Sequence, residues 1–367
     1  MGTFDRRTFL KVAGGIGATS LTALAGCSGG GSDDGTTTDA ATDSGGETTN
    51  VGMVYATGGL GDGSFNDQAQ QGIIEASEDF NVEYDEAQPE EVSQFSNYQQ
   101  QFAQSTDPSY DLIPAIGFLQ TDPLSETAPN YPDQNFMIVD SVVEADNVAS
   151  YVFREHEGSY LVGQLAGLLT TREFSAGAGT TKPDQKSVGF VGGVESDLIK
   201  KFEAGFIAGV KSIDSEIEVQ TSYVGAFNEP STGEETAISM YESGSDVVYH
   251  ASGNTGTGVF EAAQGKGRFA IGVDRDQSIT KDSYADVILA SMVKRVDTAV
   301  YEAVEAVVND SFESGVTTLG LDDNGVEAVY GQQLGAEIPQ EIKDQIASTR
   351  EAIMNGDVTV PTAPENS

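Results

Sequence analysis

Segments with strand character and segments with helical spacing alternate along most of this chain, and no other feature of the sequence restricts the fold as much. In a first series, strands are expected at residues 51–55, 82–86, 111–117, 135–140 and 148–153. In a second series, they are expected at residues 187–192, 219–225, 246–252, 269–274 and 287–291. Helices are expected near residues 65–80, 93–105, 121–128, 155–170, 196–213, 231–242, 256–265 and 293–308, with a last one opened by Pro339. This pattern predicts an α/β fold with parallel sheets, and two series of similar length predict two similar lobes.

Local features refine this prediction. Pro114 is an objection to a central strand at 111–117, because proline cannot donate to a central ladder and is confined to edges or bulges. Ser231 and Glu234 form a capping box that marks a helix start. Residues 171–185 are glycine-rich and predict an irregular surface loop, and the connection that follows residue 308 is rich in Gly and Asp.

The first strand runs directly into a helix through a glycine-rich loop. Residues 58–63 include four glycines, whose permissive backbone lets a ligand approach main-chain N–H groups, and Ser64 can cap the helix. The loop has no G-x-x-x-x-G-K-[ST] motif, and Asn66 stands where G-x-G-x-x-G needs its last glycine. Since ligands of open α/β sheets bind at such junctions, a ligand site is expected here.

Residues 61–66 bring an acid, a hydroxyl, an aromatic ring and an amide to this junction. The π-face of Phe65 beside the amide of Asn66, which both donates and accepts, suits a planar heteroaromatic ligand such as a nucleobase. The alternative is that Phe65 is the first core residue of the helix and Asn66 a surface residue. The residues alone leave both interpretations open.

The charge of the chain indicates its environment. Asp and Glu number 58 against 18 Lys and Arg, a formal net charge of −40. Self-repulsion on this scale is relieved by screening, so a salt-rich setting is expected, as in a halophilic archaeon, and nucleic acid is excluded as a partner. Cys27 is the one cysteine and the chain has two histidines, so an intramolecular disulfide is impossible and a His-based metal site has little material.

The N-terminus has the pattern of an export signal. Arg6 and Arg7 begin a segment that resembles a twin-arginine signal, and the apolar stretch after it is too short to span a bilayer as a permanent helix. Residues 24–27 resemble a lipoprotein box, so residues 1–27 are expected to be a signal cleaved before a lipidated Cys27. Residues 28–49, rich in Gly, Ser, Thr and Asp, are expected to form a flexible stalk. The protein is therefore expected at the extracellular face of the cell membrane, held there by a lipid anchor.

Several segments together resemble the basic membrane protein family of solute-binding lipoproteins, whose best-understood members are purine nucleoside receptors that feed ABC transporters. They are GDGSFN at 61–66, FREHEGSYL at 153–161, VGFVGG at 188–193, KFEAGF at 201–206, GNTG at 253–256, IGVDRDQ at 271–277 and SMVK at 291–294. The resemblance runs from about residue 50 to residue 356. It departs from the family pattern at Gly61-Asp62, where an acid pair is common, and in the segment after Gly117.

The resemblance implies the architecture and the partners. It implies a type I periplasmic-binding-protein fold, in which two Rossmann-like lobes with parallel sheets are joined by a hinge of three crossovers. The implied first lobe covers residues 50–153 plus 293–315, the second covers 154–292 plus 316–356, and 357–367 form an unstructured tail. The implied protein is a monomer that binds a purine nucleoside, delivers it to the permease subunits of an ABC importer, and uses no cofactor or metal.

The resemblance also implies a set of ligand-binding residues. Phe65 and Phe202 would stack on the two faces of the base, while Asn66 and Asp140 would bond its edge. Asp274 and Lys294, with the main chain at Gly253, would hold the ribose hydroxyls. A carboxylate can accept two O–H bonds, which matches Asp274 to vicinal hydroxyls.

Alternatives remain for these residues and for the function. Phe202 also belongs to the apolar face of its expected helix and fits a core residue. Lys294 also fits a solvated surface lysine. A nucleoside hydrolase using Asp62, Asp140 or Asp274 is a second functional hypothesis, although the sequence lacks G-x-S-x-G and H-E-x-x-H motifs. A sensory receptor that presents its ligand-bound form to a membrane signalling partner is a third.

Overall fold

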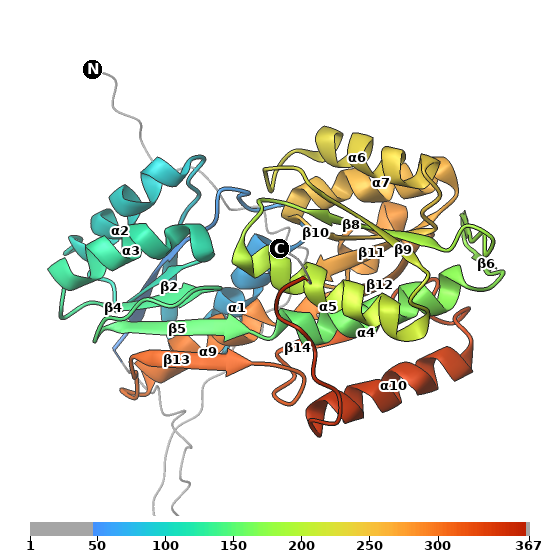
Figure 1. Ribbon diagram of the computed structural model, residues 1–367. Coiled ribbons are helices and arrows are strands. Elements are labelled where there is room, and N and C mark those ends of the chain that lie inside the picture. Colours follow the sequence, from blue (N-terminus) through green and yellow to red (C-terminus); the bar gives the residue numbers. More distant parts are fainter. Residues whose placement is uncertain (1–46, 365–367) are drawn as a thin grey trace, which may run out of the picture. The chain divides into compact units, whose positions relative to one another are not determined.

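Two six-stranded sheets organise residues 47–364, the part of the chain that the computed structural model describes (Figure 1). The first contains β1 (Thr49–Val54), β2 (Val82–Ala87), β3 (Leu112–Ala115), β4 (Asn135–Val139), β5 (Val148–Phe153) and β13 (Gly315–Leu319). The second contains β8 (Ser187–Gly192), β9 (Glu218–Tyr223), β10 (Val247–Ala251), β11 (Phe269–Asp274), β12 (Ile288–Lys294) and β14 (Val326–Tyr330). Their orders, β2-β1-β3-β4-β5-β13 and β9-β8-β10-β11-β12-β14, are equivalent strand by strand.

All strand pairs of the two sheets are parallel except β12–β14, which is antiparallel. Parallel strands buried on both faces read as near-continuous apolar runs, as in the wholly buried segments of β3, β8, β10 and β11. The alternation of strands and helices therefore predicted the sheets correctly. The carboxyl ends of the parallel strands of each sheet lie along one edge, where ligand sites form in open α/β sheets.

Helices cover both faces of each sheet (Figure 1). On the first sheet, α1 (Phe65–Asp79) packs with α9 (Val296–Val308) on one face, and α2 (Phe95–Ala103) with α3 (Thr121–Thr127) on the other. On the second, α4 (Glu155–Thr170) packs with α5 (Asp197–Ile213) on one face, and α6 (Pro230–Glu242) with α7 (Gly256–Lys266) on the other. The short α8 (Gln277–Thr280) follows β11, and α10 (Gln340–Met354) packs against α4.

The chain crosses between the two sheets three times. Arg154 links β5 to α4, Arg295 links β12 to α9, and residues 320–325 link β13 to β14. The crossovers bond to one another, since the Arg154 N–H donates to Leu319 O at 2.8 Å and the Arg295 N–H donates to Gly325 O at 2.9 Å. This confirms the predicted fold class, with two Rossmann-like halves and a hinge of three crossovers.

The strand predicted at 111–117 is present despite the objection raised by its proline, whereas a predicted helix cap was wrong. Pro114 lies in β3, a central strand; β3 pairs with β1 only at Leu112 and Ala115, so the missing donor leaves a gap in the ladder rather than an edge. The predicted capping box of Ser231 and Glu234 is absent, because α6 begins at Pro230 and its N-cap makes no side-chain bond.

Other boundaries moved because pairing is not visible in a local pattern. The strand β13 lies in the Gly- and Asp-rich connection and pairs with β5. Helix α9 begins at Val296, since the preceding residues to Lys294 pair within β12 and β14. The expected loop at 171–185 contains a small hairpin of β6 (Ser175–Ala176) and β7 (Gly179–Thr180).

The described part of the chain contributes nothing that could serve as a transmembrane helix, because none of its helices combines the required length and hydropathy. The twin-arginine segment, Cys27 and nearly all of the stalk lie outside the described residues. Residues 357–364 contain neither helix nor strand.

Candidate functional site

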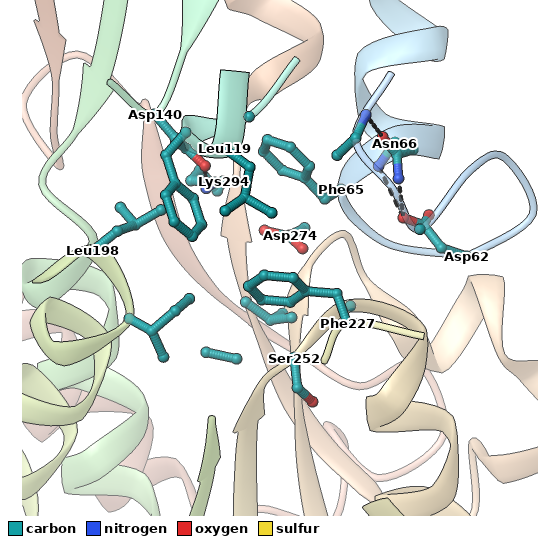
Figure 2. A pocket seen from close by; sticks show the side chains of 18 of the residues that line it. Asp62, Phe65, Asn66, Leu119, Asp140, Leu198, Phe227, Ser252, Asp274 and Lys294 are labelled. Carbon is teal, nitrogen blue, oxygen red and sulfur yellow. Dashed lines mark hydrogen bonds and ion pairs between the residues drawn. The ribbon is translucent and has the colours of Figure 1, made fainter. Parts of the chain in front are cut away.

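A cavity of about 650 Å³, its open mouth included, lies where the carboxyl ends of the two sheets face each other (Figure 2). Its lining comes from loops that follow β1, β3, β4, β9 and β10, from the starts of α1 and α5, and from the last residues of β10, β11 and β12. The lining residues are Ala56, Thr57, Gly58, Asp62, Phe65, Asn66, Gly117, Phe118, Leu119, Asp140, Leu198, Ile199, Phe202, Phe227, Ala251, Ser252, Gly253, Val273, Asp274 and Lys294. The structure thus brings all seven residues predicted to bind ligand to one cavity.

The loop between β1 and α1 is built around Asp62. Its buried carboxylate accepts hydrogen bonds from the backbone N–H groups of Ser64 at 2.8 Å and Asn66 at 3.0 Å. The acid therefore satisfies donors at the start of α1, a role predicted for the hydroxyl of Ser64. Ser64 occupies the N-cap position but makes no capping bond, which leaves its hydroxyl for another partner.

The amide of Asn66 is bonded within the same loop (Figure 2). Its Oδ1 accepts from the Ala56 N–H at 2.9 Å, and its Nδ2 donates to Asp62 Oδ2 at 3.2 Å. Asn66 is 2% exposed, so it is not the surface residue of the alternative interpretation. The side-chain amide thus holds the loop against β1, and Asn66 also lines the cavity.

Lys294 and Asp140 form an ion pair on the wall of the cavity. Their Nζ and Oδ2 atoms are 2.6 Å apart, and the two side chains are 2% and 4% exposed. The Nζ also lies 4.7 Å from the ring centroid of Phe65 and 5.4 Å from that of Phe202, within cation–π range. Lys294 is therefore not the solvated lysine of the alternative interpretation.

The charges around Lys294 keep it protonated. Burial alone would lower the pKa of Lys294, but the carboxylates of Asp140, Asp274 and Glu155 outweigh this effect and raise the pKa above its usual value. One donor of the ammonium group is used by Asp140. An ammonium has three donors, so Lys294 can also donate into the cavity.

Asp274 is the last residue of β11 and points into the cavity between Phe65 and Phe227 (Figure 2). Its Oδ2 accepts a hydrogen bond of 2.5 Å from Ser64 Oγ. Burial raises the pKa of Asp274 to about 6, although Lys294 and the Ser64 hydroxyl act to lower it. Within residues 47–364, no protein group donates to its Oδ1, which is left to accept from a ligand.

Asp140 offers a similar acceptor. Its Oδ1 is buried and has no hydrogen-bond partner among the described residues, while its Oδ2 accepts from Lys294. A buried acceptor without a partner costs free energy that a ligand donor recovers. The cavity therefore presents two carboxylate oxygens and one ammonium to a molecule that carries several hydrogen-bonding groups.

Aromatic rings form the walls around these charges. Phe65 and Phe202 were singled out from the sequence, whereas Phe118 and Phe227 were not. Phe118 and Phe227 approach each other edge to face with ring centroids 6.2 Å apart. Phe227 follows β9, so its place in the carboxyl-end loop of a predicted strand was the signal that could have identified it.

Gly253 supports the position of Phe227. Gly253 has a φ of +56°, and a Cβ at this position would lie 3.1 Å from the carbonyl oxygen of Phe227. The left-handed backbone and the close contact both favour glycine here. Besides the main-chain contact with the ligand that was predicted for it, Gly253 leaves room for the loop that carries Phe227.

The two histidines give no sign of a metal site. Burial lowers the pKa of His250 to about 4 and that of His156 to about 4. Across residues 47–364 no group of three or more His, Cys, Asp or Glu side chains is arranged to hold a metal ion. His250 instead bonds Gln277 Oε1 at 2.9 Å and Ser252 Oγ at 3.2 Å beneath the cavity.

Comparison with known proteins identifies relatives along nearly the whole described chain. A family model described as ABC transporter substrate-binding protein PnrA-like matches residues 49–363. The chain is 34% identical over 331 residues to a CD4+ T-cell-stimulating antigen of Listeria monocytogenes, covering 86% of this chain and 88% of that protein. It is 33% identical over 328 residues to the ABC transporter nucleoside-binding protein BmpA of Lactococcus lactis, covering 84% and 88%.

A solved structure shows the same arrangement. The crystal structure of a solute-binding protein of an ABC transporter system from Aeropyrum pernix K1 superposes with a TM-score of 0.75 at 27% identity. The match covers 87% of this chain and 94% of that one. Sequence and structure thus point to the same group of proteins.

Proposed function

Because this chain belongs to the PnrA-like family of ABC transporter substrate-binding proteins, we propose that it binds a nucleoside in its cavity and delivers it to the permease of an importer. The observation that carries this proposal is the convergence of aromatic walls with Asp140, Asp274 and Lys294 in one cavity. A flat heterocycle with a hydroxyl-bearing sugar offers the matching groups.

The base stacks on the aromatic walls in this proposal. Phe65 and Phe202 both line the cavity, and their ring centroids lie 4.7 Å and 5.4 Å from Lys294 Nζ. Stacking of a base on an aromatic ring contributes about 1–3 kcal/mol. Asp140 Oδ1, which has no protein partner in the described chain, accepts an N–H of the base, and Asn66 also lines the cavity.

The sugar is bound by the charged side of the cavity. Asp274 Oδ1 accepts from the ribose hydroxyls, Lys294 donates to their oxygens, and the backbone at Gly253 completes the contacts. Hydrogen bonds to charged groups are roughly twice as strong as neutral ones. Removal of water from this cavity strengthens them further.

The proposal extends to the organisation of the whole chain. The lobes are assigned to residues 50–153 plus 293–315 and to residues 154–292 plus 316–356, with two adjustments from the sheets. Strand β13 extends the first lobe to Leu319, and strand β12 extends the second lobe to Lys294. Export by a twin-arginine signal, lipidation of Cys27 and a stalk that ends before β1 would hold the protein as a monomer outside the membrane, near its permease. The predicted stalk at 28–49 is thus one residue too long, because Thr49 pairs within β1. Relatives from Pyrococcus are named lipoproteins.

Calorimetric titration in molar KCl tests the function. Adenosine, guanosine, inosine and uridine are titrated into the purified protein, and purine nucleosides are expected to bind with micromolar dissociation constants or tighter. An Asp274→Asn variant is the matched control, since it keeps the shape and removes the charge. If none of the four nucleosides produces binding heat, the proposal is wrong.

Two further measurements separate the alternatives. Inosine incubated with the protein is analysed for free hypoxanthine, whose release would favour the nucleoside hydrolase. If nucleosides bind and are not cleaved, reconstitution with an ABC permease of the same organism distinguishes transport from signalling. Nucleoside-dependent uptake is the expected result, and its absence with an intact permease would favour the sensory receptor.

A further inference from the structure

The hydroxyl of Ser64 joins the two lobes at the carboxylate that faces the ligand. We propose that Ser64 is a positioning residue, which orients Asp274 for the hydroxyls of the ligand only while the two lobes are together. The inference rests on the proposed function, in which Asp274 binds those hydroxyls. It assigns a role to a residue that does not line the cavity.

The geometry of this contact is specific. Ser64 Oγ lies 2.5 Å from Asp274 Oδ2, and the two residues are 0% and 5% exposed. They are 210 positions apart in the chain and belong to the loop before α1 and to the end of β11. One oxygen of the carboxylate is thus used by the first lobe, and the other accepts from no group of the described chain, while Asp274 itself lines the cavity (Figure 2).

Ser64 is available for this contact because Asp62 has taken over the capping of α1. The Asp62 carboxylate accepts from the N–H groups of Ser64 and Asn66, while the Ser64 side chain makes no capping bond. A serine at this position would otherwise cap the helix. The aspartate therefore fixes the backbone of the loop and leaves the hydroxyl directed at Asp274.

A second contact holds the same loop. The carbonyl oxygen of Gly63 accepts from Thr280 Oγ1 at 2.8 Å and from Gln277 Nε2 at 3.3 Å. Gln277 is itself fixed, since its Oε1 accepts from the Val273 N–H at 2.8 Å. The loop of the first lobe is therefore anchored by two side chains that follow Asp274 in the second.

Sharing one carboxylate couples lobe closure to ligand recognition. The bond from Ser64 restricts rotation of the Asp274 carboxylate, so that Oδ1 is held toward the cavity. When the lobes separate, Ser64 leaves with its loop and the carboxylate loses this donor. Full affinity for the hydroxyls of the ligand then requires the closed arrangement with the bond from Ser64 in place, whereas stacking of the base does not use this bond.

The first test compares ligands with and without hydroxyls. Inosine and 2′,3′-dideoxyinosine are titrated into wild-type protein and into the Ser64→Ala variant. Loss of the positioning bond is expected to raise the dissociation constant of inosine by about tenfold, as for a hydrogen bond to a charged group. The dissociation constant of dideoxyinosine should rise much less. The ratio of the two dissociation constants therefore shrinks in the variant.

The second readout is the pH dependence of inosine binding. The groups that interact with Asp274 are Lys294, Ser64, Asp140, Asp62 and the buried Tyr249. Because the Ser64 hydroxyl lowers the pKa of Asp274, its removal should move the midpoint of the affinity profile to higher pH. A purely structural role of Ser64 would leave this midpoint in place.

Two control variants isolate the effect. Thr280→Val removes a donor to Gly63 without touching Asp274, so it should weaken both ligands by the same factor. Ser77→Ala removes a hydroxyl that bonds Ile74 O within α1, and no change is expected. Ser64→Thr is the second variant, for use if Ser64→Ala fails to fold. It keeps a hydroxyl, so its ratio of the two dissociation constants should equal that of the wild type.

The outcomes separate this inference from the proposed function. If wild type binds inosine and Ser64→Ala keeps both the wild-type ratio and the wild-type midpoint, the positioning role is wrong and the nucleoside function stands. If both ligands weaken equally in Ser64→Ala, Ser64 is a structural contact only. If wild type binds neither ligand, the proposed function fails and the positioning role fails with it.

Discussion

Asp140 and Asp274 occupy equivalent positions in the two sheets, and both have left-handed backbones. Asp140 follows β4 with a φ of +68°, and Asp274 ends β11 with a φ of +64°. Among non-glycine residues, Asp and Asn tolerate this region best, and its cost is characteristic of functional sites. Each lobe thus turns one carboxylate toward the single ammonium group of Lys294.

The ion pair between Lys294 and Asp140 leads to a stability prediction. Lys294→Met leaves the Asp140 carboxylate buried without its cation and should lower the free energy of unfolding by about 3–5 kcal/mol. Adding Asp140→Asn removes the stranded charge and should recover most of that loss. Denaturant unfolding of the two single variants and the double variant measures the coupling, and strictly additive effects would contradict a direct pair.

Asp274→Asn should weaken nucleoside binding and remove its pH dependence. The variant loses a charge-assisted bond, about 1–3 kcal/mol, with little effect on folding. In the wild type, the pKa of Asp274 is raised to about 6, so the acceptor is ionised above that pH and protonated below it. Affinity should therefore be constant above about pH 7 and fall toward about pH 5. A variant with wild-type affinity but a clearly lower free energy of unfolding would assign Asp274 to structure.

Alanine substitutions at the two predicted stacking residues should affect the stability of the protein differently. Phe65 is half-buried, so Phe65→Ala should cost about 1–3 kcal/mol of binding and little stability. Phe202 is 2% exposed and belongs to the core, so Phe202→Ala should lower the free energy of unfolding by about 3–5 kcal/mol as well. Unfolding and titration of both variants measure this contrast. Binding unchanged in Phe65→Ala would exclude stacking on that ring.

Glu155 should contribute a stability that is present in acid and is lost toward neutral pH. Burial raises the pKa of Glu155 from 4.5 to about 7, against the opposing effect of Lys294 and Lys201, and its two carboxylate oxygens have no hydrogen-bond partner in the described chain. The folded state therefore retains a proton that the unfolded state releases above pH 4.5, so stability decreases as pH rises from there to about 7.

Glu155→Gln cannot ionise, and it should lose this dependence and be more stable than wild type at about pH 8, by at most about 3 kcal/mol. Unfolding free energies measured across this range check the sign. The exposed Glu144→Gln serves as control and should follow the wild type. A wild-type stability that rises between about pH 5 and pH 7 while Glu155→Gln stays flat would contradict the assignment.

The net charge of −40 predicts stabilisation by salt. Raising KCl from about 0.2 M to about 2 M shortens the Debye length to a few ångströms and screens repulsion among the carboxylates. The Tm should rise by several degrees, where about 2–4 °C corresponds to 1 kcal/mol for a domain of this size. Sucrose at equal osmolality is the control for general exclusion effects. Equal increases in the two solutes would show that screening is not the cause.

Local periodicity and length predicted much of the fold. The segments 155–170 and 187–192 were predicted with the bounds of α4 and β8, because their apolar spacing is set by packing on their own faces. The strand β13 was missed, since four of its five residues are exposed and it exists through pairing with β5. Pro114 misled for the same reason, because its tolerance depends on which neighbour needs a donor.

In the candidate site, too, the sequence indicated some residues correctly and missed those whose role depends on distant contacts. Family-like motifs indicated residues as distant as Phe65 and Lys294, and the structure places them around one cavity. Phe227 was missed because it lies in a loop without periodicity, and Ser64 was interpreted as a cap because serine before a helix has that local meaning. Its partner, Asp274, is more than two hundred residues away.

The sequence by itself determined that two α/β halves form, that the chain is strongly acidic, and which side chains stand at the ends of the strands. These properties depend on residue type and on spacing along the chain. Only the tertiary structure decided which carboxylate pairs with Lys294, which accepts from Ser64, and which oxygens remain for a ligand. Such contacts depend on how the strand ends of two separate sheets face each other. A local sequence pattern contains no information on the distance between residues of different sheets.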